Sequence, residues 1–294
     1  LVQWSVPVST WQDPRVPGFA YSARDLNITP LPGASFAVSG LVSGEFGFTF
    51  DQRFDALGRG QDFARVAANS KFSFLVNLDV DLGANGQLAS VVVSGVFVGF
   101  ASYSLTVYYP EYGSIMPGGL NADPPSLKAA SNGLGVAFAR DIPGTAATDA
   151  DMLITRAGLD GSWGAQVALA QDTAGTQAGP ELVQIPSGTY LAAWHTLPNT
   201  AAPTAGGISA RFVDADFQPT GNEIDIAANG IDVALTVLTD GRVAFAYEVN
   251  GDIRMRLFDA ATSALTPEVT IADGAVRLHG VKLTALLDGG FAAA

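Results

Sequence analysis

Cysteine is absent from the 294-residue chain, which excludes disulfide bonds, thiolate metal ligands and a cysteine nucleophile. Charged residues are scarce at 15%, and the acidic ones prevail, with 28 acidic residues against 15 lysines and arginines and a formal net charge of −13. We therefore expect no nucleic-acid partner, because phosphate binding needs a clustered basic face. The hydrophobic share of 48% predicts a folded chain with a large buried core.

Targeting and membrane signals are also missing. Residues 1–30 show no basic segment followed by an apolar one, so no signal peptide is visible. Residues 88–109 are uncharged and long enough for a membrane-spanning helix. Serines and glycines interrupt this segment, most of its apolar residues are β-branched or aromatic, and Gly-Phe-Ala-Ser at 99–102 marks a turn. We expect two buried strands there and a protein that does not span a membrane.

A turn followed by a short apolar strand recurs six times along the chain. Successive turn glycines are 53, 47, 55, 53 and 48 residues apart: Gly33, Gly86, Gly133, Gly188, Gly241 and Gly289. A second signal, an Arg-apolar-Asp turn beginning at Arg53, Arg211 and Arg256, keeps the same phase. A nearly constant step predicts one supersecondary unit repeated along the whole chain.

One unit is expected to contain four short strands. In the clearest copy these are residues 233–238, 242–249, 252–258 and 268–272, and the Asn-Gly pair at 250–251 is a strong signal for a two-residue hairpin turn. A four-stranded antiparallel unit repeated at this period is typical of a propeller blade. Residues 61–69 have some helical character, but their phase in the repeat favours a strand.

The sequence therefore predicts an all-β fold, a β-propeller of about six four-stranded antiparallel blades in a single repeat domain of residues 1–294. The expected units lie near residues 25–75, 76–123, 124–179, 180–230, 231–278 and 279–294. The sixth unit is short, so we expect either that residues 1–24 supply a closing strand or that the chain is part of a longer protein. A pair of β-sandwiches with a boundary near Pro124-Pro125 is the alternative architecture.

The unit resembles a degenerate repeat of about 50 residues found in very large secreted bacterial proteins, where it accompanies RTX-type calcium-binding nonapeptides. Matching positions are Asp288–Phe291, Leu191–Trp194, Arg53–Ala56 and Gly221–Ile224. No RTX nonapeptide array occurs in this chain, so calcium-dependent export does not carry over. The resemblance implies a secreted or cell-surface protein that binds or scaffolds.

Calcium is the one cofactor for which the sequence offers candidate ligands. Asp79, Asp81 and Asn85 alternate before Gly86, as oxygen ligands do in a calcium loop. Gly83 stands at a ligand position, and no acidic residue follows until Glu111. A strand-terminating turn is therefore the alternative for this segment.

Other chemistry-bearing residues are sparse, and no catalytic residue is assigned. His195, one of only two histidines, is expected as a half-buried residue near the end of a strand, and no Gly-x-Ser-x-Gly elbow is present. The segment Asp160–Trp163 is expected as a plain turn, since its spacing departs from the Asp-box of sialidase-type propellers. A tyrosine group is either buried packing or a glycan platform: Tyr103, Tyr108, Tyr109 and Tyr112.

These observations predict a structural or adhesive repeat protein, extracellular or at the cell surface, with other protein subunits or surface glycans as partners. The alternative is a carbohydrate-active enzyme or a lectin that uses the axial funnel of the ring. An enzyme would bring at least two carboxylates, such as Glu181 and Asp232, together at one end of the inner strands.

Overall fold

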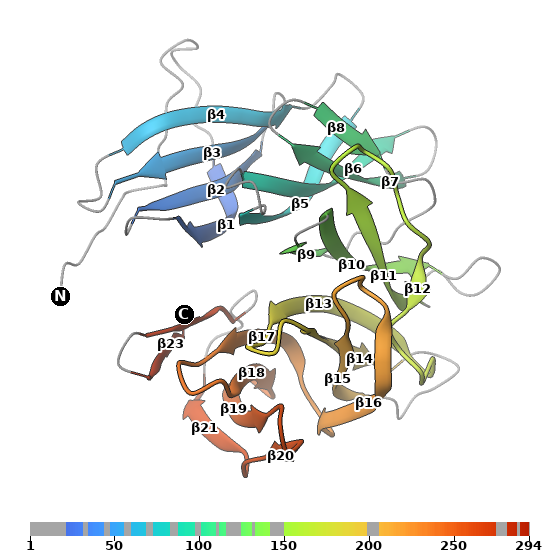
Figure 1. Ribbon diagram of the computed structural model, residues 1–294, viewed down its shortest axis with the longest axis vertical. Coiled ribbons are helices and arrows are strands. Elements are labelled where there is room, and N and C mark those ends of the chain that lie inside the picture. The colour runs from blue at the N-terminus through green and yellow to red at the C-terminus, as the bar shows by residue number, and fades with distance from the viewer. Residues whose placement is uncertain are drawn as a thin grey trace. The chain divides into compact units, whose positions relative to one another are not determined.

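The computed structural model describes residues 22–31, 35–43, 48–55, 60–68, 73–82, 88–97, 101–109, 112–115, 125–130, 133–141, 150–198, 206–274, 281–286 and 289–293. These residues form strands and turns, and among them there is no helix that could cross a membrane. The chain divides into an N-terminal unit of residues 1–134 with 158–162 and a C-terminal unit of residues 135–157 with 163–294 (Figure 1).

The first two sheets lie in the N-terminal unit and are antiparallel, with their four strands in sequence order. Sheet 1 contains β1 (Ser22–Pro30), β2 (Phe36–Ser43), β3 (Phe48–Phe54) and β4 (Gly60–Ala68). Sheet 2 contains β5 (Ser73–Leu82), β6 (Leu88–Phe97), β7 (Ala101–Tyr109) and β8 (Tyr112–Ile115). The uncharged segment 88–109 is thus a strand pair, and residues 60–68 form a strand, as the repeat phase predicts.

Sheets 3 and 4 repeat this arrangement of four antiparallel strands in sequence order. Sheet 3 contains β9 (Ser126–Ala130), β10 (Gly133–Asp141), β11 (Ala150–Gly158) and β12 (Val167–Ala168). Sheet 4 contains β13 (Thr176–Gln184), β14 (Tyr190–Leu197), β15 (Gly207–Val213) and β16 (Pro219–Ala227).

Sheet 5 has a divided outer strand, because β20 and β21 pair with different parts of β19. Its strands are β17 (Ile231–Val237), β18 (Val243–Val249), β19 (Asp252–Asp259), β20 (Ala264–Leu265) and β21 (Val269–Ala272). The sixth sheet has two strands among the described residues, β22 (Leu283–Ala285) and β23 (Phe291–Ala293). The expectation of an all-β chain of antiparallel, four-stranded sheets is therefore confirmed.

Three of the repeat glycines occupy the same kind of turn between first and second strands. Gly188, Gly241 and Gly289 have φ values of 86°, 86° and 89°. In each turn the glycine N–H donates to the carbonyl three residues earlier, as Gly188 does to Ile185 at 2.9 Å. This is a type I turn closed by a left-handed residue, which glycine adopts without strain. Gly133 has a φ of 153° and begins β10, while Gly33 and Gly86 lie outside the described residues.

The turn between β15 and β16 of sheet 4 has the same hydrogen bond but carries a phenylalanine at the left-handed position. Phe217 has a φ of 60°, and its N–H donates to the Asp214 carbonyl at 3.1 Å. The Asp214 carboxylate accepts two further backbone N–H groups within the turn, as an Asx turn does. The Phe217 ring is buried 4.7 Å from the Tyr190 ring and occupies the space that a side chain at Gly135 would need.

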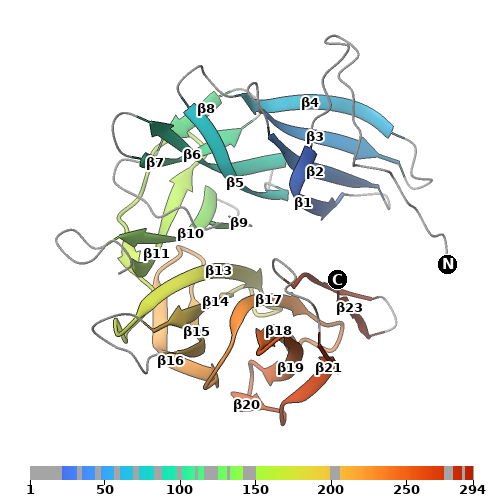
Figure 2. The same cartoon turned by 180° about the vertical axis from the view of Figure 1, so that it is seen from behind.

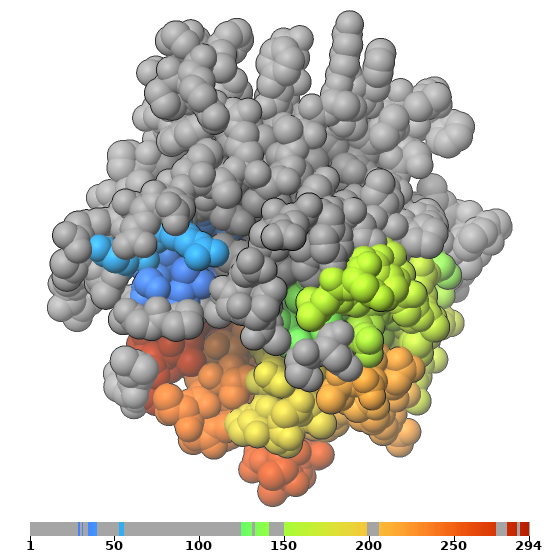
Figure 3. All heavy atoms as spheres, turned by 45° about the horizontal axis from the view of Figure 1, so that its top comes forward, coloured from blue at the N-terminus to red at the C-terminus, as the bar shows by residue number. Residues whose placement is uncertain are grey.

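Consecutive sheets of the C-terminal unit pack face to face. Residues of sheets 4 and 5 share one buried apolar cluster that includes Leu191, Ile208, Phe245 and Phe258. On its other face, sheet 5 buries Ala234, Ala246 and Ile253 against Val281 and Leu283. Alternate side chains of one strand point to opposite faces, so the nearly all-apolar β18 serves both packing faces. Figure 3 shows in colour the residues whose side chains are placed, and most of them lie between residues 125 and 293.

The first strands of successive sheets contact one another. In the C-terminal unit β13 lies beside β17 (Figure 2), and β17 contacts β22. In the N-terminal unit the same relation links β1, β5 and β9. Each sheet therefore places its first strand next to the first strand of its neighbour within the unit.

Candidate functional site

Chemistry-bearing side chains gather where the first strands of sheets 4 and 5 begin and their second strands end. We call this the start edge and define it by residues 178–181 and 195 of sheet 4 and residues 231–234 and 248 of sheet 5. Antiparallel pairing brings these segments together, because Ala178 opposes His195 and Ile231 opposes Glu248.

A β-bulge interrupts the first strand at the start edge of both sheets. The register shifts between Ala178 and Glu181 in β13 and between Ile231 and Ala234 in β17. Each bulge contains a left-handed residue nine positions before its turn glycine, namely Gly179 with a φ of 57° and Asp232 with a φ of 53°. Bulges bend a strand and re-aim its side chains, and they occur often beside functional sites.

His195 is the buried polar group of the start edge. Its side chain is 6% exposed, and its Nδ1 atom is buried without a hydrogen-bond partner among the described residues. Burial lowers the pKa of the imidazole, and the nearby Asp232 carboxylate opposes this effect. The ring lies over the bulge of its own sheet, since a Cβ atom at Gly179 would come within 2.7 Å of it. His195 is thus more buried than the half-buried residue predicted, and it is neutral at neutral pH.

Two carboxylates stand at the start edge in different electrostatic situations. Glu181, on β13, accepts a hydrogen bond from Lys282 Nζ at 3.0 Å, and its side chain is 26% exposed. Asp232, on β17, interacts electrostatically with His195. Lys282 therefore forms an ion pair with Glu181, whereas Asp232 acts on the charge state of His195. Glu181 and Asp232 lie at the same end of the neighbouring strands β13 and β17.

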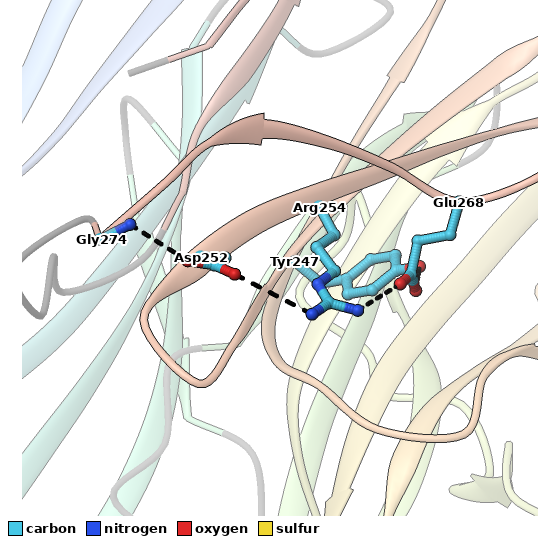
Figure 4. Close-up of polar contacts among 5 residues, drawn as sticks. All are labelled: Tyr247, Asp252, Arg254, Glu268 and Gly274. Atoms are coloured by element: carbon cyan, nitrogen blue, oxygen red, sulfur yellow. Dashed lines mark hydrogen bonds and ion pairs between the residues drawn. The ribbon is translucent and has the colours of Figure 1, made fainter.

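A second polar cluster ties the outer strand of sheet 5 to its interior (Figure 4). The Tyr247 hydroxyl donates to Glu268 Oε2 at 2.7 Å, and Arg254 Nη1 donates to Glu268 Oε1 at 2.6 Å. Arg254 Nη2 lies 3.9 Å from Asp252 Oδ2, and the Gly274 N–H donates to Asp252 Oδ1 at 3.0 Å. The cluster links β18, β19 and both ends of β21.

The charges of this second cluster suit a structural role and not proton transfer. We call Tyr247, Arg254 and Glu268 the clamp, because they hold the outer strand of sheet 5 to its interior. The hydrogen bond from Tyr247 lowers the pKa of Glu268, and Arg254 lowers it further. Burial, followed by the bond to Glu268, raises the pKa of the Tyr247 phenol. Glu268 is therefore ionised and Tyr247 neutral throughout the physiological range, so neither group is poised to transfer a proton.

The predicted calcium ligands are only partly described. Asp79 and Asp81 lie within β5, where they oppose Val91 and Ala89, and Asn85 falls outside the described residues. In the part of the chain that the structure describes, no three histidine or acidic side chains are grouped as a metal site. Calcium binding at Asp79, Asp81 and Asn85 stays a prediction.

Other residues singled out from the sequence are placed as follows. Tyr103, Tyr108 and Tyr109 lie in β7 and Tyr112 begins β8. Asp160 forms the expected turn, in which its Oδ1 atom accepts from the Ser162 N–H at 3.0 Å. Of the predicted closing segment 1–24, residues 1–21 lie outside the described residues, and residues 22–24 belong to β1 and pair with β2.

Sequence reasoning missed the pairing of His195 with Asp232 and the Tyr247–Arg254–Glu268 clamp. The signal for the first was the repeat itself, because His195 stands seven residues after Gly188 and Asp232 nine residues before Gly241. Both offsets belong to the same end of a four-stranded sheet. For the clamp, the alternation of Arg254 and Arg256 in an otherwise apolar strand was the only signal.

Known structures share the fold at low sequence identity. A protein of unknown function from Dyadobacter fermentans is 12% identical, with a TM-score of 0.57, over 90% of this chain and 85% of its own. The NanB sialidase from Streptococcus pneumoniae is 9% identical, with a TM-score of 0.59, over 91% of this chain and 64% of its own. The GH93 α-L-arabinofuranosidase of Fusarium graminearum, solved with arabinobiose, is 10% identical, with a TM-score of 0.56, over 91% of this chain and 86% of its own.

These likenesses show a common fold and no common activity, because all identities are far below those of close relatives. The chain spans 64% of the length of the sialidase. A scan against protein-family models and a search of the curated proteins both return no match.

Proposed function

We propose that the chain is a β-propeller of about six blades that binds carbohydrate as a scaffold outside the cell or at its surface. The observation that carries the proposal is the fold shared over 91% of the chain with both a sialidase and an arabinofuranosidase. These two enzymes are named for different sugars, and their likeness to this chain supports carbohydrate as its ligand class.

The ring itself is part of the proposal. Two observations support it, the contact between the first strands of successive sheets and the face-to-face packing of sheets 4, 5 and 6. Closure seals the two terminal sheets that an open array would leave exposed. Residues 22–24 pair with β2 in sheet 1, so the part of the predicted closing segment before them would extend the sheet of β22 and β23. Deleting residues 1–12 should then lower the melting temperature sharply and promote oligomers. An unchanged melting temperature would reject closure by this segment.

The acidic balance of the chain suits a binding scaffold. A surface rich in ionised carboxylates, with a net charge of −13, keeps a binding scaffold soluble outside the cell.

A panel of immobilised sialylated, arabinose-containing and neutral hexose oligosaccharides tests the proposal directly. We expect binding to at least one class, reproduced by calorimetry in solution, and no shorter products after prolonged incubation. Absence of binding across the whole panel would refute the proposed function.

Hydrolysis is the second candidate function, because the sialidase and the arabinofuranosidase are both enzymes. Release of monosaccharide from any panel member, abolished by Glu181→Gln or Asp232→Asn, would favour it over binding alone. Both residues lie at the start edge, where an acid and a base would have to converge.

A further inference from the structure

The outer strand of sheet 5 exposes two apolar side chains, Val269 and Ile271, which are 53% and 36% exposed. We call them the outer pair. Val269 opposes Met255 on β19, and Met255 opposes Ala246 on β18. Opposed residues share one face of a sheet, as do alternate residues of one strand, and Ala246 lies on the face against which Leu283 of β22 packs. The outer pair therefore lies on the face of sheet 5 that is turned towards sheet 6.

Sheet 4 buries the residues at the equivalent positions. Counted across the strand ladder from the residue five positions after each turn glycine, Ile224 corresponds to Val269 and Ile226 to Ile271. Ile226 is 0% exposed, and Ile224 packs against the apolar cluster that sheets 4 and 5 share. The same two positions are thus covered in sheet 4, where a five-stranded sheet follows, and exposed in sheet 5.

Sheet 6 is the sheet that should cover the outer pair. Among the described residues it consists of β22 and β23 alone, so its edge beyond β23 has no strand on it in that part of the chain. Its residues Leu283 and Ala293 oppose each other, as do Ala285 and Phe291, and Leu283 marks their common face as the one towards sheet 5. A further strand beside β23 would continue this apolar face over the outer pair.

Residues 2–8, which lie outside the described residues, have the sequence of a strand suited to such an edge. Strict alternation of apolar and polar residues is typical of a strand with one buried face, and proline within a strand is confined to edges. Residues 9–21 join this segment to β1 and reach about 40 Å when extended. The apolar side of the segment comprises Val2, Trp4, Val6 and Val8, and the other side comprises Gln3, Ser5 and Pro7.

We propose that residues 2–8 pair with the outer edge of β23 and cover Val269 and Ile271 with their apolar side. The inference rests on the ring included in the proposed function and names the surface on which that ring closes. It does not depend on the carbohydrate ligand. Docking would occupy an open sheet edge and remove two exposed apolar side chains from water in one step.

The absence of cysteine from the chain makes the cover directly measurable. Val269→Cys and Ile271→Cys each introduce a single thiol, whose rate of reaction with a water-soluble maleimide reports its exposure. Thr270→Cys is the matched control, because its side chain is exposed on the opposite face of the same strand. Each rate is compared with that of the same variant lacking residues 1–12, so that differences in intrinsic thiol reactivity cancel. We expect the deletion to speed the reaction at 269 and 271 by about tenfold or more and to leave the rate at 270 unchanged.

Substitutions within the segment give the same test without shortening the chain. Trp4→Asp and Val6→Asp place a charge on the apolar side and should raise the rates at positions 269 and 271. Gln3→Asp and Ser5→Asp place the same charge on the other side of the segment. They should change those rates by less than about twofold, because a side chain on that face points away from the outer pair.

The outcomes distinguish this proposal from the proposed function. Protection at 269 and 271 that Trp4→Asp removes, that Ser5→Asp leaves in place and that dilution does not change would establish the docking surface. Thiols that react as fast in the full chain as after the deletion would overturn it, even where the deletion lowers the melting temperature. Protection lost on dilution, with dimers in sedimentation, would overturn it in favour of a second copy. A failure of the oligosaccharide panel would refute carbohydrate binding and leave the docking surface standing.

Discussion

Sheets 4 and 5 are two copies of one repeat. Their backbone features agree, whereas polar side chains at equivalent positions differ. Both bulge at the start of the first strand, and both turn on a left-handed glycine, Gly188 or Gly241. They differ in what fills equivalent places, since His195 corresponds to Glu248 by its distance from the turn glycine. The repeat therefore specifies the frame, and single substitutions within it create the polar sites.

The largest difference lies in the turn that carries Phe217, and its removal should have the largest effect. Phe217→Ala deletes a ring that is 1% exposed and packs 4.7 Å from Tyr190. Truncation of a buried phenylalanine costs about 3–5 kcal/mol. We expect a loss in this range in the free energy of unfolding, measured with urea.

Gly135→Ala tests the same contact from the other side. A Cβ atom at Gly135 would overlap the Phe217 ring, so the ring must move out of its buried position. Both single variants should be destabilised, and the double variant should lose less than their sum. Additive losses would mean that the two residues act separately.

The clamp of sheet 5 should give the second-largest effect. Glu268→Ala leaves the Tyr247 hydroxyl and the Arg254 guanidinium without their acceptor, and orphaned polar groups of this kind cost about 1–3 kcal/mol. In sheet 4 the outer carboxylate, Glu223, accepts the exposed backbone N–H groups of Gln171 and Asp172. Glu223→Ala is therefore the matched control and should lose clearly less. Equal losses would show that the clamp adds nothing.

Acid should weaken the clamp in a defined direction. The pKa of Glu268 is lowered in the folded chain, so its contribution to stability is complete above the ordinary glutamate pKa of 4.5 and is lost as the pH falls through the folded value. Stability measured from pH 7 to pH 3 should fall less steeply in Glu268→Gln than in the unaltered chain.

The strands and turns of the repeat could be predicted from the sequence alone, because apolar runs and turn residues determine them locally. The strands expected at 242–249 and 252–258 match β18 and β19 within one residue. Asn250 and Gly251 both have positive φ values, as their hairpin turn requires. The two-residue β20 was missed, because so short a strand has no period to detect.

The candidate site was harder to predict, since it depends on contacts between sheets. Phe217 was invisible as a turn residue because the left-handed position favours glycine or asparagine, and only burial against Tyr190 explains it. The burial of His195 was underestimated because the bulge at Gly179, over which the ring lies, has no signal in a single sequence. The conformation of Phe217 and the burial of His195 both depend on strand register and on packing between side chains that are distant in sequence.

Burial of His195 predicts a smaller effect, a dependence of stability on pH that comes from sheet 4. Burial lowers the pKa of His195 in the folded chain, so the unfolded chain binds the proton more readily. Stability is then complete above the ordinary histidine pKa of 6.5 and declines as the pH falls towards the folded value. The melting temperature should drop between pH 8 and pH 5, and His195→Gln should remove part of that drop. A drop of equal size in both proteins would reject this role for the ring.

The smallest effect is expected at the turn between the first two strands of sheet 5. Asp240 and Arg242 form an exposed ion pair at 2.6 Å, whereas the equivalent positions in sheet 4 are Ser187 and Thr189, which share a hydrogen bond at 2.8 Å. Exposed pairs contribute little, because water screens the charges and ordering the side chains costs entropy. The double variant Asp240→Ser with Arg242→Thr therefore converts one turn into the other, and its melting temperature should change by no more than the error of measurement, at low and at high salt. A marked loss, present only at low salt, would show that the ion pair stabilises the turn and that the glycine alone is insufficient.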